Sequence, residues 1–331
     1  MVRVAINGFG RIGRMVFRAG FDDPDIEWVA INDLTDAKTL AHLLRNDSVH
    51  GRFKAKVEHT DNALIVNDKE IRILAEKNPE QLPWKDMEVD VVVESTGLFR
   101  TLDKASLHLK AGAKKVLLSA PAKGEEDVKT LVIGVNEHTY DKEKDDVVSN
   151  ASCTTNCFAP VAKVLKDNYG IKKGFMATIH SYTSDQRIVD GPHKDLRRAR
   201  AAAINMVPTT SGAAIAVSKV IPELKGKLHS EAIRVPLPNG SVIYFVCQLE
   251  KTPGAEEVNK LFKDVAEHHM KEVLEYSEEP LVSQDIIGNP HSIIFDASLT
   301  QINNDLLKVV AWYDNEIGYS HRMIDVLKMM I

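Results

Sequence analysis

Three glycines near the start of the chain constrain its fold more than any other segment. Gly8, Gly10 and Gly13 directly follow the apolar run 2–6 and open the helical pattern of residues 11–20. In such a strand-turn-helix unit the first glycine permits a tight turn and the second lets the backbone approach a pyrophosphate. The third allows the helix to pack closely on the strand. The segment therefore predicts the nucleotide-binding turn of a doubly wound parallel sheet.

The end of the next strand indicates which dinucleotide binds. Residues 28–31 form a second apolar run that ends in Asn32-Asp33, and Asp33 lies 20 residues after Gly13. A carboxylate at this place accepts hydrogen bonds from the adenosine ribose and repels a 2′-phosphate. A surface aspartate after a tight turn is the alternative interpretation. We expect NAD rather than NADP as the cofactor.

The first half of the chain alternates short runs rich in Val and Ile with helical stretches. This alternation predicts a parallel sheet of the Rossmann type with helices on both faces. The predicted strands are 2–6, 28–31, 89–94, 115–119 and 131–135, and the predicted helices are 11–20, 37–44 and 103–111. The short runs 56–58, 63–66 and 71–74 indicate a small antiparallel insertion.

Around residue 150 the pattern changes to longer strands with fewer helices between them. The predicted strands are 174–181, 230–235, 241–249, 292–296 and 307–313, with helices at 213–220 and 256–274. This pattern predicts a second, α+β domain with a mostly antiparallel sheet. The final stretch, 318–330, is amphipathic and helical, and its pattern allows packing on either domain.

A cysteine between two hydroxyl side chains marks the start of the second domain. The segment Ser152-Cys153-Thr154-Thr155-Asn156-Cys157 precedes the helical stretch 158–165, in which Pro160 leaves the helix boundary open. A helix N-terminus favours thiolate over thiol, and its free N–H groups suit an anion. Cys153 is therefore either a nucleophile beside an anion pocket or a buried helical cysteine. Because the spacing to Cys157 matches no usual zinc or redox pattern, we expect packing there and no metal.

Further polar residues provide candidates for the rest of such a site. His180 ends an apolar run, and its imidazole is able to take a thiol proton and return it to an oxyanion. The basic stretch 193–200, the hydroxyl-rich 209–212 and Arg234 are candidate anion ligands, because the planar fork of arginine suits a phosphate. A packed histidine and solvated basic residues are the alternatives. Together these groups would form two phosphate pockets, more than one dinucleotide requires.

The composition limits which partners the protein is expected to bind and in which cellular compartment it is expected to work. The chain has 331 residues, 44% hydrophobic and 27% charged, which is typical of a globular protein of about two domains. A net charge of −5 and the absence of aromatic residues from 193–200 argue against nucleic acid. No apolar run approaches the ~20 residues of a membrane span. Three cysteines and an N-terminus without a leader pattern favour the cytoplasm.

Taken together, these motifs resemble those of one enzyme family. Ala-Ser-Cys-Thr-Thr-Asn-Cys at 151–157, His-Ser-Tyr-Thr at 180–183 and Trp-Tyr-Asp-Asn-Glu at 312–316 are highly specific in combination. The chain resembles the phosphorylating glyceraldehyde-3-phosphate dehydrogenases of the bacterial and eukaryotic type over essentially its whole length. The resemblance implies an NAD-binding domain (1–151, completed by the C-terminal helix 318–331) and a catalytic domain (152–317). It also implies a homotetramer in which the loop 182–205 reaches a neighbouring subunit's cofactor.

The resemblance further implies a mechanism. Cys153 attacks the aldehyde of glyceraldehyde 3-phosphate to form a hemithioacetal. His180 raises the reactivity of the thiol and acts as the base when hydride leaves for the nicotinamide. Inorganic phosphate then attacks the resulting thioester and releases 1,3-bisphosphoglycerate. An erythrose-4-phosphate dehydrogenase, with a similar fold and cysteine, is the alternative enzyme. A catalytically silent NAD-binding protein is disfavoured by the joint presence of the reactive residues.

The remaining site residues are implied by the same resemblance. The residues that match the substrate-phosphate site are Thr183, Asp185 and Arg234. Those that match the inorganic-phosphate site are Ser152, Thr154, Ser211 and Gly212, with Arg198 beside them. Those that match dinucleotide contacts are Gly8, Gly10, Arg11, Ile12, Gly13, Asp33 and Ser119, and Asn315 matches the residue that orients the nicotinamide amide. The chain departs from the usual family residues at Gly191, Ser211, Gly240 and Tyr244, and Gly191 makes tolerance of NADP an open question.

Overall fold

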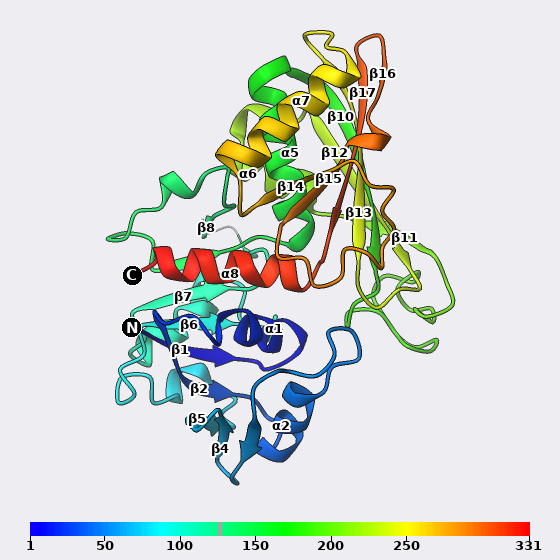
Figure 1. Cartoon of the computed structure of the whole chain (residues 1–331). Helices are drawn as coiled ribbons and strands as arrows, with labels where there is room; N and C mark the ends of the chain where they lie inside the picture. The colour runs from blue at the N-terminus through cyan, green and yellow to red at the C-terminus, as the bar shows by residue number, and fades with distance from the viewer. Residues whose placement is uncertain (125–127) are drawn as a thin grey trace. The chain divides into compact units, whose positions relative to one another are not determined.

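The computed structural model describes residues 1–124 and 128–331. The chain divides into two compact units. The first comprises Met1–Leu131, Glu137–Ala151 and Ser320–Ile331, and the second comprises Val132–Asn136 and Ser152–Tyr319. Each unit is built around one sheet (Figure 1).

A largely parallel sheet forms the first unit. Among the described residues its nine strands lie in the order β3-β4-β5-β2-β1-β6-β7-β9-β8, and only the pairings of β4 with β3 and β5 are antiparallel. The strands are β1 (Val2–Asn7), β2 (Ile26–Asn32), β3 (Val57–His59), β4 (Ala63–Val66), β5 (Lys69–Leu74), β6 (Val91–Glu94), β7 (Lys115–Leu118), β8 (Lys129–Thr130) and β9 (Val147–Ser149). Because β1 lies between β2 and β6, the strand order reverses there. Ligands bind at the carboxyl ends of strands at such a switch point.

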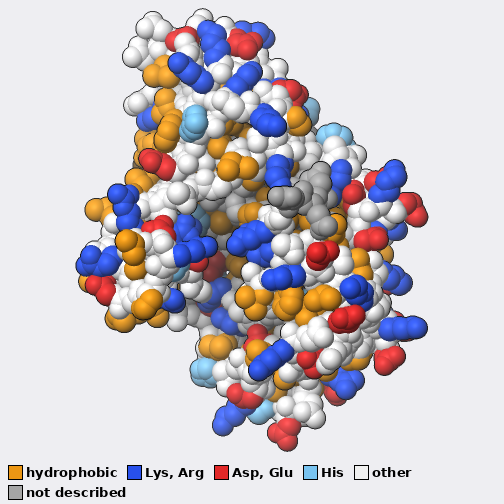
Figure 2. Space-filling model, turned by 180° about the vertical axis from the view of Figure 1, so that it is seen from behind, with side chains coloured by type: hydrophobic (Ala, Val, Ile, Leu, Met, Phe, Trp, Pro, Cys, Tyr) orange, Lys and Arg blue, Asp and Glu red, His pale blue; other side chains and the backbone are white. Residues whose placement is uncertain are grey.

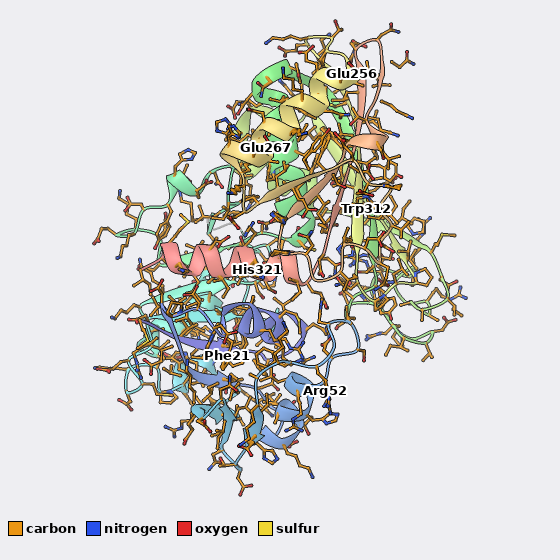
Figure 3. The ribbon with its side chains drawn as sticks, in the orientation of Figure 1. Phe21, Arg52, Glu256, Glu267, Trp312 and His321 are labelled. Atoms are coloured by element: carbon orange, nitrogen blue, oxygen red, sulfur yellow. The ribbon has the colours of Figure 1, made fainter. Side chains whose placement is uncertain are left out.

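The helices of the first unit pack on this sheet through apolar faces. They are α1 (Arg11–Gly20), α2 (Ala37–Arg45), α3 (Leu102–Ala105), α4 (Leu107–Lys110) and most of α8 (Ile317–Met329). Phe21, labelled in Figure 3, follows α1, and its ring centroid lies 5.4 Å from that of Phe17 and 5.6 Å from that of Phe53. A Cβ added to Gly20 would lie 2.6 Å from Cδ1 of Ile324. Because Gly20 has no side chain, α8 can pack closely against the end of α1.

A mostly antiparallel sheet forms the second unit. Among the described residues its strands follow the order β11-β12-β10-β13-β17-β15-β14, with β16 paired to β17. Only β10–β12 and β14–β15 are parallel pairs. The strands are β10 (Ile171–Ser181), β11 (Val207–Thr210), β12 (Leu228–Val235), β13 (Ser241–Leu249), β14 (Leu274–Ser277), β15 (Ile293–Asp296), β16 (Gln301–Asn303) and β17 (Leu306–Tyr313). The predicted fold class, a Rossmann-type parallel sheet plus an α+β domain, is confirmed.

Three helices belong to the second unit: α5 (Cys153–Tyr169), α6 (Ala213–Val220) and α7 (Ala255–Asp264). The longest, α5, packs on β10, β13 and β17, and it continues through Pro160 (Figure 1). The aromatic ring of Phe158 on α5 meets that of Phe245 on β13 edge-on, with centroids 4.8 Å apart. Trp312, labelled on β17 in Figure 3, donates its indole N–H to Asp296 Oδ2 at 3.0 Å. These contacts hold the start of α5 at a fixed place on the sheet.

The strand predicted at 131–135 is wrong. This segment is a turn, in which Gly134 has a φ of 83° and Asn136 Oδ1 accepts the Val132 N–H at 2.9 Å. This side of the sheet ends instead with β9 and the edge strand β8, which pair with each other and lie on either side of this segment in the chain. Leu131 and Val132 are completely buried, so their apolar character reflects burial rather than strand structure.

Two predicted helices also differ from the structure. The predicted helix 256–274 leaves α-helical geometry at Val265, continues as a π-helix over Val265–His269, and ends there. Leu274 instead begins β14, because it pairs with Ile293 of β15. The predicted helix 103–111 is interrupted at Ser106 and becomes α3 and α4. Tertiary pairing has overridden local helix propensity at the first of these places.

Charged side chains of both signs are interspersed on the face shown in Figure 2. Within residues 1–124 and 128–331, no helix has both the length and the apolar character required to cross a membrane.

Candidate active site

The predicted nucleophile is the first residue of α5. Cys153 is half-buried, and Ser152 caps the helix by accepting the Thr155 N–H through Oγ at 3.1 Å. Ala151, just before the cap, has a left-handed φ of 54°. That conformation costs a non-glycine residue about 1 kcal/mol, and it marks a sharp change of chain direction ahead of the cysteine.

His180 lies within reach of this cysteine. Its Nε2 is 3.4 Å from Cys153 Sγ, and its Nδ1 is 2.7 Å from the Ser181 carbonyl oxygen. An unprotonated Nδ1 at that distance would set two lone pairs against each other, so we assign the proton to Nδ1. Arg234 Nη1 lies 2.9 Å from Nδ1 and 3.0 Å from the same carbonyl oxygen, and we assign its N–H to that oxygen, which then accepts from both groups. Nε2 is therefore the free base that faces the sulfur.

Burial controls the charge of both groups. It lowers the pKa of His180 to about 3, with the positive charge of Arg234 acting in the same direction. Burial raises the pKa of the Cys153 thiol, whereas Arg234 and hydrogen bonds from Thr154 lower it. The helix N-terminus stabilises the thiolate form of Cys153, whereas burial destabilises that form. The sequence did not reveal this burial. Because Sγ and Nε2 share a short contact, one proton can pass directly between them.

Arg234 is the best-placed cation for an anion beside the sulfur. It comes from β12, which runs parallel to β10, and its register partner on that strand is His180. Its Nε is buried and has no hydrogen-bond partner among the described residues. A buried guanidinium N–H without a partner is costly unless a ligand satisfies it. This observation supports the predicted phosphate role of Arg234.

Arg198 is largely engaged within the protein. Its Nε donates to Thr209 Oγ1 at 3.0 Å, its Nη1 lies 2.5 Å from Asp185 Oδ2, and its Nη2 donates to the Thr210 carbonyl oxygen at 3.2 Å. The Asp185 carboxylate therefore pairs with Arg198, and by charge it would repel a phosphate. Thr183, also predicted at the phosphate site, is exposed. Its carbonyl oxygen accepts the Gln186 N–H at 2.9 Å.

The two hydroxyl-rich turns each precede a helix. At α6, Ser211 Oγ accepts the Ala213 N–H at 3.2 Å, and a Cβ on Gly212 would meet no atom within 4 Å. At α5, the Thr154 hydroxyl lies 3.0 Å from the Tyr313 hydroxyl. The Ser211 side chain thus stabilises its own turn and the Thr154 side chain contacts β17, whereas backbone N–H groups at a helix N-terminus are the groups suited to an anion.

Tyr313 is a site residue that the sequence reasoning did not identify. Its buried hydroxyl lies 2.8 Å from Thr178 Oγ1, and its ring packs edge-on against the imidazole of His180 with centroids 5.9 Å apart. The signals in the sequence were its place at the end of an apolar run and within the motif Trp-Tyr-Asp-Asn-Glu at 312–316. Apolar periodicity predicts burial there but not a polar partner.

In the first unit the surroundings of the three glycines differ in the way that their spacing predicts. Gly8 has a φ of 91°, and a Cβ there would lie 2.7 Å from the Thr96 backbone nitrogen. A Cβ on Gly13 would lie 2.2 Å from the Gly8 carbonyl oxygen, whereas a Cβ on Gly10 would meet no atom within 4 Å. The turn, the helix packing and an open approach to the backbone each need a different glycine.

Asp33 is fixed at the carboxyl end of β2. Its Oδ2 accepts the Phe9 N–H at 2.8 Å, and its Oδ1 accepts the Thr35 N–H at 3.0 Å. Each oxygen retains a lone pair, so the carboxylate can still accept from two vicinal ribose hydroxyls. The residues therefore fit an adenosine ribose.

The other predicted dinucleotide residues surround the same sheet end. Arg11 forms an ion pair with Asp47, and Ile12 is half-buried in the first turn of α1. The Ser119 N–H donates to the Glu94 carbonyl oxygen at 3.0 Å, directly after β7. Leu34 and Leu98, which the sequence pattern did not single out, are exposed by 63% and 69%. A large apolar residue shortly after a strand end was the available signal for both.

The structure accounts for one departure from the family pattern, Gly240, and leaves Gly191 and Tyr244 without a structural explanation. Gly240 has a φ of 87°, and a Cβ there would lie 2.7 Å from the Ser283 carbonyl oxygen, so only glycine fits. At Gly191 the nearest atom to a Cβ would lie 3.7 Å away, so a side chain is sterically allowed. Tyr244 is exposed, and Lys308 Nζ lies 5.9 Å from its ring centroid.

Comparison with known proteins identifies the family. The family model described as "Glyceraldehyde 3-phosphate dehydrogenase, NAD binding domain" matches residues 2–102, and the one described as "Glyceraldehyde 3-phosphate dehydrogenase, C-terminal domain" matches residues 152–315. The chain is 60% identical to a glyceraldehyde-3-phosphate dehydrogenase of Geobacillus stearothermophilus, over 98% of this chain and 97% of that protein. It is 57% identical to glyceraldehyde-3-phosphate dehydrogenase 1 of Bacillus subtilis, with the same coverage. The predicted family is confirmed: the chain belongs to the glyceraldehyde-3-phosphate dehydrogenases.

Proposed function

We propose that the protein oxidises glyceraldehyde 3-phosphate to 1,3-bisphosphoglycerate with NAD and inorganic phosphate. The observation that carries this proposal is the contact of 3.4 Å between Cys153 Sγ and His180 Nε2. The names of the relatives favour the triose phosphate over erythrose 4-phosphate.

The first step joins the sulfur to the aldehyde carbon. Cys153 Sγ attacks C1, the carbonyl electron pair moves to oxygen, and the thiol proton passes through His180 Nε2 to that oxygen. The product is a hemithioacetal. The Nδ1 proton of His180, held by the Ser181 carbonyl oxygen at 2.7 Å, keeps Nε2 directed at the reacting atoms.

The second and third steps convert the hemithioacetal into an acyl phosphate. Bound NAD would supply the acceptor for the hydride that leaves C1. His180 Nε2 takes the hydroxyl proton as the carbonyl reforms, which leaves a thioester on Cys153. A phosphate oxygen then attacks the thioester, the C–S bond breaks, and the thiolate regains a proton from His180. Thioester formation retains the oxidation energy in a bond that phosphate can cleave.

Two groups of donors support two anion sites. Arg234, with its unsatisfied buried Nε, is proposed to hold a phosphate near the sulfur. The N-termini of α5 and α6, at Ser152–Thr154 and Ser211–Gly212, are proposed to hold the second. Beside these two sites we place Thr183, Asp185 and Arg198. In this proposal the carboxylate of Asp185 does not bind phosphate but holds the guanidinium of Arg198 in position.

The first unit is proposed to bind NAD, and the second to carry the chemistry. The glycine turn would accept the pyrophosphate and Asp33 the adenosine ribose, with Arg11, Ile12 and Ser119 beside them. Leu34 and Leu98 follow β2 and β6, the two strands that flank β1. Their exposed side chains are proposed to contact the adenine ring, whose faces are apolar.

The active form is proposed to be a cytoplasmic homotetramer. Within the segment 182–205 four large apolar side chains, Ile188, Val189, Leu196 and Ile204, are exposed by 72–83%. Apolar side chains gathered on one loop are typical of a protein interface. The three cysteines are all free thiols, which fits a reducing compartment.

The test is formation of NADH from glyceraldehyde 3-phosphate with and without inorganic phosphate. We expect turnover that depends on phosphate, and loss of turnover in Cys153→Ser. The matched control is Cys157→Ala, one helical turn further along α5, which should retain turnover because Cys157 is completely buried and packed within the unit. An acid product formed without phosphate, or faster turnover with erythrose 4-phosphate, would contradict the proposal.

A further inference from the structure

A row of polar side chains crosses the carboxyl ends of three neighbouring strands in the first unit. Asn7 of β1 is the register partner of both Asn32 of β2 and Glu94 of β6, and all three residues are buried. Asn32 Nδ2 donates to Asn7 Oδ1 at 2.7 Å, and Asn7 Nδ2 donates to Glu94 Oε2 at 2.6 Å. The row therefore ties three strand ends together at the place where the strand order reverses.

The backbone fixes the direction of these hydrogen bonds at one end of the row. Asn32 Oδ1 accepts the Glu76 N–H at 2.9 Å, and Asn32 Nδ2 donates to the Glu76 carbonyl oxygen at 2.8 Å. Because a backbone N–H can only donate, the Asn32 amide cannot be turned round. Its Nδ2 therefore faces Asn7, which must present Oδ1 to Asn32 and Nδ2 to Glu94.

An indole fixes the direction at the other end. Trp84 and His108 are completely buried, and Trp84 Nε1 donates to His108 Nδ1 at 3.0 Å. An indole N–H can only donate, so the proton of the neutral imidazole is on Nε2. This Nε2 lies 3.2 Å from Glu94 Oε2 and 3.3 Å from Asn7 Nδ2. Since both nitrogens are donors, both donate to the carboxylate rather than to each other.

Glu94 is the acceptor at which both chains of hydrogen bonds end. Its Oε2 accepts from Asn7 and His108. Its Oε1 accepts the Thr96 N–H at 2.8 Å and also the Thr96 hydroxyl. These four donors occupy the lone pairs of the carboxylate, and each of them is uncharged. Glu94 therefore holds its neighbours by hydrogen bonds rather than by attraction between opposite charges.

The segment that Glu94 holds borders the glycine turn. A Cβ on Gly8 would lie 2.7 Å from the Thr96 backbone nitrogen, so the turn lies directly against this backbone. The Thr96 hydroxyl also accepts the Leu98 N–H at 3.1 Å. Leu98 carries the exposed side chain that we place against the adenine ring. One carboxylate thus controls the position of both the turn and Leu98.

We propose that Glu94 is a positioning residue that holds the glycine turn and Leu98 in the arrangement required by the adenosine half of NAD. Asn7 and His108 determine the direction of its hydrogen bonds. This inference rests on the proposed NAD site in the first unit. It deepens that proposal because it assigns the preformed shape of the site to a carboxylate that is only 2% exposed.

The variant Glu94→Gln keeps the size of the side chain and replaces one acceptor by a donor. If the new Nε2 faced Asn7 and His108, it would meet two donors that cannot be reversed. If it faced Thr96, only the Thr96 N–H would lose its acceptor, because the hydroxyl can rotate and accept instead. The second orientation costs less, so the segment after β6 should loosen.

Calorimetry with NAD and with ADP-ribose measures this loosening. If about one molecule in ten of the variant keeps the competent arrangement, both Kd values should rise about 10-fold. ADP-ribose lacks the nicotinamide, so an equal rise for the two ligands places the effect on the adenosine half. The KM for NAD should rise in parallel, while kcat at saturating NAD and the KM for glyceraldehyde 3-phosphate stay unchanged. An unchanged Kd for ADP-ribose would overturn the proposal.

The matched control is Asp90→Asn, at the opposite end of the same pair of strands. Asp90 directly precedes β6, and its Oδ2 accepts the N–H of Arg3 on β1 at 2.8 Å. The control therefore also alters a carboxylate that ties β1 to β6, but at the amino ends of the strands. Its unfolding midpoint should fall while both Kd values stay native. The same rise in Kd in Asp90→Asn would refute a specific role for Glu94.

A second pair of variants keeps the proposal testable if Glu94→Gln does not fold. Thr96→Val keeps the shape of a half-buried side chain and removes the hydroxyl that joins Glu94 to Leu98, whereas Thr96→Ser keeps that hydroxyl. The Kd for ADP-ribose should rise about 3- to 10-fold in Thr96→Val and stay near the native value in Thr96→Ser. Equal Kd values in the two variants would contradict the proposal. A native protein that binds ADP-ribose but makes no NADH would instead refute the proposed function, which these binding ratios do not measure.

Discussion

Replacing Gly10 or Gly13 by alanine should separate binding of the cofactor from stability of the fold. The two glycines lie in the same turn, yet their surroundings differ. A Cβ on Gly13 would lie 2.2 Å from the Gly8 carbonyl oxygen, about 1 Å inside the usual carbon–oxygen contact distance. A Cβ on Gly10 would meet no atom within 4 Å.

These distances set the expected magnitudes. Gly13→Ala must push α1 away from the end of β1, and forced overpacking of this kind costs about 1–3 kcal/mol. Gly10→Ala should change the free energy of unfolding by no more than about 0.5 kcal/mol. Its methyl group would occupy the space where the backbone approaches a pyrophosphate. Loss of one hydrogen bond to a charged group, worth about 1.5–3 kcal/mol, would raise the Kd for NAD roughly 10- to 100-fold.

The assay is denaturant unfolding of both variants without NAD, at one protein concentration, together with calorimetric titration of NAD. Gly13→Ala should lower the unfolding midpoint, and Gly10→Ala should lower only the affinity for NAD. Equal midpoints for the two variants would refute the argument from close packing. Native affinity for NAD in Gly10→Ala would refute the argument that the pyrophosphate approaches this backbone.

Three further predictions concern single side chains. Tyr313→Phe removes a buried hydroxyl that two threonines contact, so the free energy of unfolding should fall by about 1–3 kcal/mol in denaturant titrations. Burial raises the pKa of Asp47, but hydrogen bonds from backbone amides and from Arg11 outweigh burial and lower the pKa to about 2. Because the folded pKa is depressed, this carboxylate should add about 1 kcal/mol of stability above about pH 4 that disappears as the pH falls toward 2, and Asp47→Asn should lack that part of the pH dependence. Arg234 lowers the pKa of the Cys153 thiol, so in Arg234→Met the pH profile of iodoacetamide alkylation should shift to higher pH; an unshifted profile would show that Arg234 does not act on the sulfur.

Short sequence patterns correctly predicted the helices and strands that are stabilised by residues close to one another in the chain. The helix predicted at 11–20 is α1 with the same bounds, because its apolar face and glycine turn lie within one short segment. The strand predicted at 131–135 failed because the apolar residues there are buried in a turn. The helix predicted to reach 274 failed because Leu274 finds its partner in a strand that begins at Ile293, and no local pattern carries that pairing.

The sequence by itself determined the two-sheet architecture and the glycine turn and provided the candidate cysteine and histidine, because each depends on residue type and short spacing. Only the tertiary structure decided the geometry and polarity of the site. The contact between Cys153 and His180 joins a helix start to a strand end, and the pairing of His180 with Arg234 follows from the parallel register of β10 and β12. The same holds for Asn315, whose amide orientation depends on donors from β10 and from the turn before β13. Hydrogen-bond direction is a property of groups brought together in space, so it does not appear in the order of the residues.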